Sequence, residues 1–356
     1  MGNKIKISVI MAVYNTKKEH LVESIKSILN QTYKAFEFII IDDNSNYDVN
    51  SLITRFNDER IKFIQNEENK GLAGSLNIAI KKSKGEFIAR MDSDDISLPR
   101  RLEMQLEFMR KNEEVVVLGT QAINIGDKNG HRNYVYDDND KLKSQIFFNS
   151  TITHPSVMLR KNFLDINGIK YDSNFKKAQD FELWYKIIKN NGIIKQLPEV
   201  LLLYRCHPDQ ATKSSFNEQN IFANKVRVKF LNELNIYPNQ HQMDMHFNLC
   251  TYDKIEEVEL NEISKWCKKL IDNNKKVDFL ENNAFKEVLF EKWFILCLKL
   301  FRSNKKIIKD LFNNDFFRES TNIKYWPVYI GRIKIFFSNK FSKIRYNNYL
   351  NIREIE

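Results

Sequence analysis

Blocks of apolar residues separated by polar segments fill the first half of the chain, and each block predicts one element. Residues 5–13 (IKISVIMAV) are almost continuously apolar and β-branched, a pattern typical of a strand buried on both faces. Residues 20–32 follow with apolar side chains at helical spacing. The same reasoning predicts strands at 36–45, 61–69 and 86–92 and a helix at 71–85. This alternation predicts an α/β fold with a mainly parallel sheet between layers of helices.

The alternation continues to about residue 215 and then stops. Before that point the pattern predicts helices at 102–112 and 180–191 and strands at 115–125 and 154–160. Beyond it only helix-like segments follow, at 222–234, 261–273 and 283–301. We therefore predict two domains, an α/β domain over residues 1–215 and a helical domain over residues 216–356.

Composition narrows the class of protein. The chain has 356 residues, of which 42% are hydrophobic, enough for one large core and a smaller appended unit. Its four cysteines form no CxxC pair, and we expect them to be reduced in the cytosol. The start of the chain lacks the cleavage site of a signal peptide, and the longest late apolar run, residues 293–301, is too short to span a bilayer.

The net charge of +10 indicates an anionic partner, which is a nucleic acid, a phospholipid surface or a phosphate-bearing ligand. The sequence has no zinc, helix-turn-helix or RNA-binding signature, so we expect no nucleic acid.

Polar residues collect where the predicted strands end. Asn15 follows the first strand, Asp42 and Asp43 follow the second, and a group of aspartates in RMDSDD follows the fourth. Ligands of open α/β sheets bind beyond the carboxyl ends of the strands. We therefore expect the functional site at this edge.

The RMDSDD segment has the chemistry of a hard-cation site. In an extended segment Asp92 and Asp94 point to the same side while Ser93 faces away. Two carboxylates together suit Mg²⁺ or Mn²⁺. The alternative is an acidic turn that caps the helix predicted near Leu98, a task that suits Asp95.

Neither a GxGxxG fingerprint nor a GxxxxGK[ST] loop follows the first strand. Instead the chain contains, in order, the segments SVIMAVYN, SILNQTYKAFEFIIIDDNS, NKGLAGSLNIAI, GEFIARMDSDD, HPSVMLR and QDFELW. Together these resemble the nucleotide-sugar-dependent family 2 glycosyltransferases of the GT-A fold, over about residues 5–215. The resemblance implies a GT-A catalytic domain followed by a helical extension.

The resemblance also implies where the donor nucleotide binds. Ala12, Val13 and Tyr14 match the segment that lines the base and ribose of a nucleoside diphosphate sugar, and Asp43 matches the carboxylate that pairs with uracil. Gly71 matches a loop that approaches the donor closely. Two structural alternatives stay open, a turn-forming role for Asp43 and a helix-start role for Gly71.

The acidic segment matches the DxD signature of the family. This implies that Mn²⁺ or Mg²⁺ bridges Asp94 and the donor diphosphate, that Asp92 reaches the ribose or the ion, and that Ser93 is part of the donor site. The YRCH segment resembles a loop that closes over the diphosphate, so that Arg205 and His207 contact phosphate or metal. A purely structural role is the alternative for His207.

The QDFELW segment supplies the expected catalytic base. Asp180 takes the place of the family's catalytic aspartate, whereas Gln179 replaces the acid that usually precedes it. The alternative for Asp180 is a helix N-terminal acid favoured by the helix dipole. Trp184 is either an acceptor-stacking platform or core, and His154 is either an acceptor contact or structural.

The resemblance points to an inverting transferase that moves a hexose or N-acetylhexosamine from a UDP-sugar to a hydroxyl of a bacterial surface glycan such as O-antigen, capsule or lipooligosaccharide. The expected acceptor is linked to undecaprenyl diphosphate. The basic, aromatic tail from residue 326 predicts an amphipathic helix on an anionic membrane, with packing on the catalytic domain as the alternative. We expect a peripheral protein on the inner face of the bacterial cytoplasmic membrane. The rival hypothesis is a non-catalytic nucleotide-binding scaffold of a glycan-assembly complex.

Overall fold

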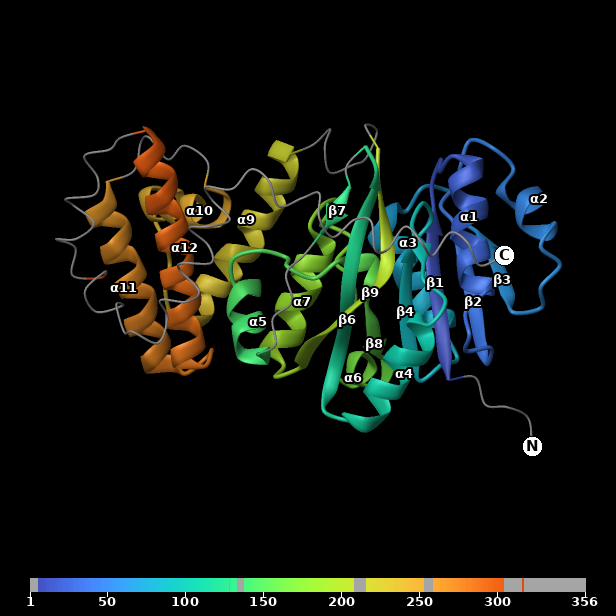
Figure 1. Cartoon of the computed structure of the whole chain (residues 1–356), viewed down its shortest axis with the longest axis horizontal. Helices are drawn as coiled ribbons and strands as arrows, with labels where there is room; N and C mark the ends of the chain where they lie inside the picture. The colour runs from blue at the N-terminus through green and yellow to red at the C-terminus, as the bar shows by residue number, and fades with distance from the viewer. Residues whose placement is uncertain are drawn as a thin grey trace. The chain divides into compact units, whose positions relative to one another are not determined.

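The computed structural model describes residues 6–127, 129–132, 138–207, 216–252, 259–303 and 316. The chain divides into two compact units, Met1–Phe230 and Leu231–Glu356 (Figure 1). The predicted amphipathic tail lies outside the described residues. Among the helices that the structure describes, none has the length and apolar character needed to cross a membrane.

The first unit is built on one sheet. The described strands form a nine-stranded sheet in the order β3-β2-β1-β4-β8-β6-β9-β5, with β7 paired to β6. Their bounds are Ile7–Val13 (β1), Phe36–Asp42 (β2), Ile61–Gln65 (β3), Phe87–Asp92 (β4), Ile96–Ser97 (β5), Val115–Gly126 (β6), Gly130–His131 (β7), Met158–Arg160 (β8) and Ile193–Cys206 (β9).

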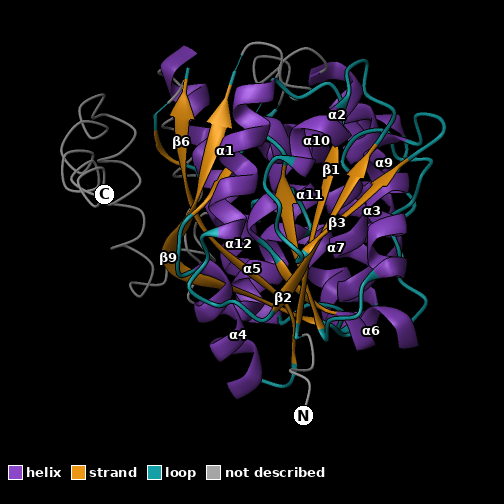
Figure 2. Ribbon diagram, turned by 90° about the vertical axis from the view of Figure 1, so that its right-hand side faces the viewer, coloured by secondary structure: helices purple, strands orange, loops and turns teal. Residues whose placement is uncertain are grey.

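The helices of the first unit connect these strands, and Figure 2 shows them around the sheet. They are Lys18–Leu29 (α1), Val49–Thr54 (α2), Gly71–Lys82 (α3), Arg101–Lys111 (α4), Asn139–Ile146 (α5), the 3-10 helix His154–Ser156 (η1), Lys161–Ile166 (α6), Gln179–Lys189 (α7) and Phe216–Glu233 (α9). The second unit contains Gln240–Thr251 (α10), Leu260–Val277 (α11) and Asn282–Ser303 (α12).

Parallel pairing gathers the strand ends that matter for function. β1 pairs in parallel with both β2 and β4, so that Val13 stands opposite Asp42 and Ala12 stands opposite Asp92. Val9 and Met11 of β1 face a core shared with α1, α2 and α4. α3 packs on β1 and β2 as well. Burial on both faces explains the continuous apolar runs of these strands, and it fixes their polar ends at one edge.

The second half of the sheet is mixed, because β8 is antiparallel to β4 and β6 whereas β6 and β9 are parallel. The sequence pattern did not predict β9. Pro198 and Glu199 interrupt its apolar pattern, and the pairing with β6 is irregular around Gly119 and Gln121. This strand is important for the site, since it ends beside the aspartates that follow β4.

Candidate active site

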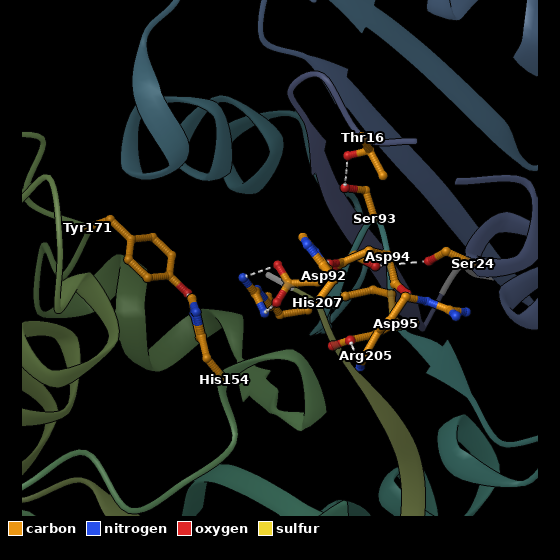
Figure 3. A network of polar contacts seen from close by, with 12 residues as sticks. Thr16, Ser24, Asp92, Ser93, Asp94, Asp95, His154, Tyr171, Arg205 and His207 are labelled. Carbon is orange, nitrogen blue, oxygen red and sulfur yellow. Dashed lines mark hydrogen bonds and ion pairs between the residues drawn. The ribbon is translucent and has the colours of Figure 1, made fainter. Parts of the chain in front are cut away.

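Three aspartates meet where β4 ends. One carboxylate oxygen from each of Asp92, Asp94 and Asp95 lies within 4.8 Å of the other two (Figure 3). Ser24 donates a hydrogen bond to the carbonyl of Asp92 at 2.9 Å, and the hydroxyls of Ser93 and Thr16 lie 2.6 Å apart. These bonds attach the acidic turn to α1 and to the loop after β1, so the turn has a fixed conformation.

Arg90 neutralises the first of the three acids. Its guanidinium holds both carboxylate oxygens of Asp92, with N–O distances of 2.7 and 2.5 Å, and its side chain is only 2% exposed. Arg101, also buried, donates to the carbonyl of Arg90 at 2.6 Å. Burial and the charge of Arg90 lower the pKa of Arg101 to about 9. The positive charge under the turn allows the acids to gather.

Asp95 does not cap a helix, contrary to one of the sequence interpretations. It is fully buried, and its Oδ1 accepts the backbone N–H of Arg205 at 2.8 Å. α4 instead begins after Arg100, which forms no side-chain cap. Burial, Asp92 and Asp94 raise the pKa of Asp95. Asp95 therefore joins the end of β9 to the acidic turn.

β9 brings the YRCH segment to the same turn. Arg205 donates from Nε to the carbonyl of Asp94 at 2.8 Å and pairs with Glu23 of α1 at 2.5 Å. His207 Nε2 lies 3.1 Å from Asp94 Oδ2. Burial and Asp92 raise the pKa of Asp94, and His207 opposes this shift. The structure thus brings together Asp94, Arg205 and His207.

A second histidine that the sequence did not single out faces this group. The ring of His20 on α1 lies 6.2 Å from the ring of His207, and burial and Arg205 lower its pKa.

The ends of β1 and β2 form the other side of the predicted donor site. Asp43 is buried, and its Oδ1 accepts from Asn66 at 2.7 Å and from the backbone N–H of Lys70 at 2.8 Å. Tyr14 is 56% exposed. Ala12 is half-buried and Val13 is buried.

Asp43 also fixes the loop that precedes α3. Gly71 begins this helix with a φ of +71°, where a Cβ atom would meet nothing within 4 Å. The left-handed backbone, and not crowding, therefore favours glycine at this position.

Asp180 lies in the first turn of α7. Its Oδ2 accepts a hydrogen bond from the Ser150 hydroxyl at 2.6 Å, and the Trp184 indole N–H donates to the same Ser150 oxygen at 3.2 Å. Trp184 is fully buried, so its ring is part of the core in this structure and offers no face to an acceptor sugar.

Tyr171, in the segment between α6 and α7, pairs with His154. Its hydroxyl lies 2.7 Å from His154 Nε2, and Figure 3 shows the two side chains pointing toward one another. Burial raises the pKa of Tyr171; Arg90 opposes the shift, and the charges of Asp180 and Asp92 add to it.

The donor set suits a hard cation that also binds substrate oxygens. Arg90 holds both oxygens of Asp92, and the Arg205 backbone N–H holds Oδ1 of Asp95. Among the described residues, Oδ2 of Asp95 has no hydrogen-bond partner, and the half-buried Asp94 has His207 beside it. Mg²⁺ and Mn²⁺ are bound in many enzymes by one or two carboxylates together with substrate phosphates. The residues present fit such an ion.

Sequence reasoning missed Arg90, Tyr171, Ser150 and His20. Arg90 precedes Asp92 by two strand positions, so the i, i+2 rule could have found it. The other three come from loops and from a helix remote in sequence, and no local pattern marks them.

Comparison with known proteins identifies the family and the fold. The family model described as glycosyl transferase family 2 matches residues 8–167. An uncharacterized glycosyltransferase of Methanocaldococcus jannaschii is 35% identical over 227 residues, which are 61% of this chain and 76% of that protein. The O-antigen biosynthesis glycosyltransferase WbnJ of Escherichia coli is 36% identical over 217 residues, 59% of this chain and 83% of that protein.

A solved structure of S. aureus TarS in complex with UDP-GlcNAc superimposes with a TM-score of 0.58 at 20% identity, over 88% of this chain and 89% of that one. The protein therefore has the GT-A fold that the sequence predicts. The chain belongs to glycosyl transferase family 2.

Proposed function

We propose that this protein is an inverting, metal-dependent glycosyltransferase that transfers a hexose or N-acetylhexosamine from a UDP-sugar to a hydroxyl of a lipid-linked bacterial surface glycan. The observation that supports the proposal is the cluster of Asp92, Asp94 and Asp95 at the carboxyl end of β4, with Arg205 and His207 from the end of β9 in contact with Asp94. This function requires that a sugar attached to a diphosphate at the acidic turn lie within reach of the Asp180 carboxylate.

The donor site would consist of three parts. Ala12, Val13, Tyr14 and Asp43 would hold the nucleoside, with Gly71 at the start of α3. Arg205 and His207 would contact the diphosphate, together with the acidic turn of Asp92, Ser93 and Asp94. A divalent cation at Asp94, with Asp92 and His207 adjacent, would offset the charge that develops on the leaving diphosphate.

Asp180 would act as the general base. Its carboxylate takes the proton of the acceptor hydroxyl while that oxygen bonds to the anomeric carbon. The bond from the anomeric carbon to the diphosphate oxygen breaks in the same step, and UDP leaves. Attack from the face opposite to the leaving group inverts the configuration at the anomeric carbon.

The relatives guide the choice of substrates. WfgD of Escherichia coli, named as a UDP-Glc:alpha-D-GlcNAc-diphosphoundecaprenol beta-1,3-glucosyltransferase, is 35% identical over 188 residues, 52% of this chain and 71% of that protein. We take a UDP-sugar and an undecaprenyl-diphosphate-linked glycan as the donor and acceptor classes. The protein would then work at the inner face of the cytoplasmic membrane, with its basic tail on anionic lipid.

The test is a panel of donors and metals. UDP release is measured from UDP-glucose, UDP-galactose, UDP-GlcNAc and UDP-GalNAc with α-D-GlcNAc-diphosphoundecaprenol, in Mn²⁺, in Mg²⁺ and in chelator. We expect acceptor-dependent release from at least one donor and its loss in chelator. Turnover that persists in chelator would contradict the metal role of Asp94.

One variant separates the enzyme from the rival scaffold. Asp180→Asn keeps the shape of the side chain but removes the base, so we expect turnover to fall by a factor of about 100 or more while UDP binding is retained. A chain that supports glycan assembly equally well with this substitution would be a scaffold.

A further inference from the structure

The two hydrogen bonds that link Trp184, Ser150 and Asp180 have fixed directions. An indole N–H can only donate, so Ser150 Oγ accepts the bond from Trp184, at 3.2 Å. The single hydroxyl hydrogen of Ser150 then remains for Asp180 Oδ2, at 2.6 Å. An ionised carboxylate only accepts, which suits this arrangement. The two oxygens of Asp180 are therefore not equivalent.

The loop that carries Ser150 is itself held in place. Arg227 of α9, 2% exposed, donates from Nε to the carbonyl of Phe148 at 2.9 Å and from Nη2 to Asn149 Oδ1 at 2.6 Å. Phe148 is buried beside Phe147. The buried guanidinium of Arg227 thus fixes Phe148 and Asn149, and the indole N–H of Trp184 fixes Ser150 itself.

From this geometry, and resting on the proposed function, we infer that Ser150 is a positioning residue that reserves Oδ2 of Asp180 and leaves Oδ1 to take the acceptor proton. Within the described part of the chain, Ser150 donates to Oδ2 of Asp180 and no group donates to its Oδ1. A carboxylate held through one oxygen keeps its orientation when the other oxygen becomes protonated. The hydroxyl of Ser150 touches neither donor nor acceptor in this scheme.

Ser150→Ala tests the inference in the full-length chain. With the most active donor of the panel and the same lipid-linked acceptor, we expect kcat to fall by a factor of about 10 to 100, the range expected for losing a hydrogen bond to a charged group. The KM for the donor and the affinity for UDP with Mn²⁺, measured by calorimetry, should stay unchanged. Ser150→Thr, which keeps a hydroxyl at the same atom, should recover most of kcat.

Thr151→Val is the matched control. Thr151 is the next residue of the same loop, and its hydroxyl forms no hydrogen bond within the described part of the chain. We expect kcat of this variant to match the wild type. A kcat for Ser150→Ala equal to that of Thr151→Val would overturn the inference, as would a parallel loss of UDP affinity or of melting temperature, since that would show a structural role.

Two results separate this inference from the proposed function. If Asp180→Asn retains turnover, the base assignment fails whatever Ser150 does. If Asp180→Asn is inactive and Ser150→Ala is fully active, only the positioning role fails. Should the panel show no turnover, a crystal structure of Ser150→Ala with UDP and Mn²⁺ decides: we expect a rotated Asp180 carboxylate, and an unchanged one would refute the inference.

Discussion

Arg90 shows how one buried side chain allows an acidic turn to exist. It holds both oxygens of Asp92, and its guanidinium is shielded from solvent. Removing one partner of a buried ion pair leaves the other charge without compensation, which is much more costly than losing an exposed pair. Arg90 would therefore contribute to stability as well as to the orientation of Asp92.

Replacing Arg90 by Met should lower the free energy of unfolding by about 3 kcal/mol, because Asp92 loses its counter-charge. Arg100→Met is the control, since Arg100 pairs with Glu103 at the surface with 64% and 45% of their side chains exposed. That variant should change stability by less than about 0.5 kcal/mol. Urea denaturation at neutral pH measures the free energy of unfolding of both variants. Equal losses would contradict the prediction that the Arg90–Asp92 pair stabilises the protein more than the exposed Arg100–Glu103 pair does.

His154 provides a pH dependence that can be tested. Burial and the nearby charge of Arg90 lower the pKa of His154 well below its ordinary value of 6.5. Between the lowered folded pKa and 6.5 the unfolded chain binds more protons than the folded one, so stability falls as pH falls through this window. At pH 8 the imidazole is neutral in both the folded and the unfolded state, so its protonation does not change the stability there.

His154→Gln should therefore flatten the fall in unfolding free energy as the pH is lowered from 8 to about 5. Glutamine is always neutral and can still form a hydrogen bond with Tyr171. Denaturation curves for the wild type and the variant at pH 8, 6.5 and 5 measure the difference between them. A constant difference over this range would show that His154 does not cause the pH dependence of the unfolding free energy.

At the scale of the elements, α7 depends on α9 for the position of Asp180. Glu182, in the same first turn of α7 as Asp180, is fully buried. The ammonium group of Lys229 on α9 lies 2.9 Å from Glu182 Oε1. The same ammonium lies 4.9 Å from the centre of the Phe175 ring. Lys186 reaches the other carboxylate oxygen at 2.9 Å. One buried acid thus joins two helices.

Lys229→Met should lower the free energy of unfolding by about 2 kcal/mol, because the buried Glu182 carboxylate loses one of its two cations. Lys225→Met, one turn earlier on α9, is the control; Lys225 is exposed and lies over the ring of Phe222. The control should stay within about 0.5 kcal/mol of the wild type. Thermal and urea unfolding measure the stability of the two variants. A loss for Lys229→Met no larger than that for Lys225→Met would show that the Lys229–Glu182 pair does not stabilise the fold.

The sequence predicted elements where one physical signal dominated. β1, β2 and β4 are buried on both faces, so their apolar runs were recognised. The carboxylates of Asp92 and Asp94 do meet, but through a turn that begins after β4 and also brings in Asp95, and not through the extended segment that the i, i+2 argument assumed. β9 was missed because Pro198 and the irregular pairing opposite it break the pattern. Ser150 and Asp180 are 30 residues apart, and only tertiary packing brings them together.

At the scale of the whole molecule, α9 decides where the catalytic unit ends. The sequence placed the boundary at residue 215, before this helix, whereas the compact unit extends to Phe230. Phe230 is fully buried against Phe147 and Phe181, and Arg227 fixes the loop before Ser150. We therefore propose that the functional catalytic domain includes α9.

Two shortened chains test this boundary. A chain that ends at residue 215 lacks Arg227, Lys229 and Phe230, so it loses the buried contacts that hold the Ser150 loop and α7. A chain that ends at residue 233 keeps all of them.

We expect the longer chain to unfold cooperatively and to bind UDP with Mn²⁺. We expect the shorter chain to melt at a lower temperature, since the loss of a buried Phe alone costs about 3–5 kcal/mol. The side chains of Arg227, Lys229 and Phe230 contact the Ser150 loop and α7, so we expect any UDP binding by the shorter chain to be weakened mainly through its lower stability. If the two chains melt at the same temperature, α9 does not belong to the catalytic unit in energetic terms, and the boundary at residue 215 stands.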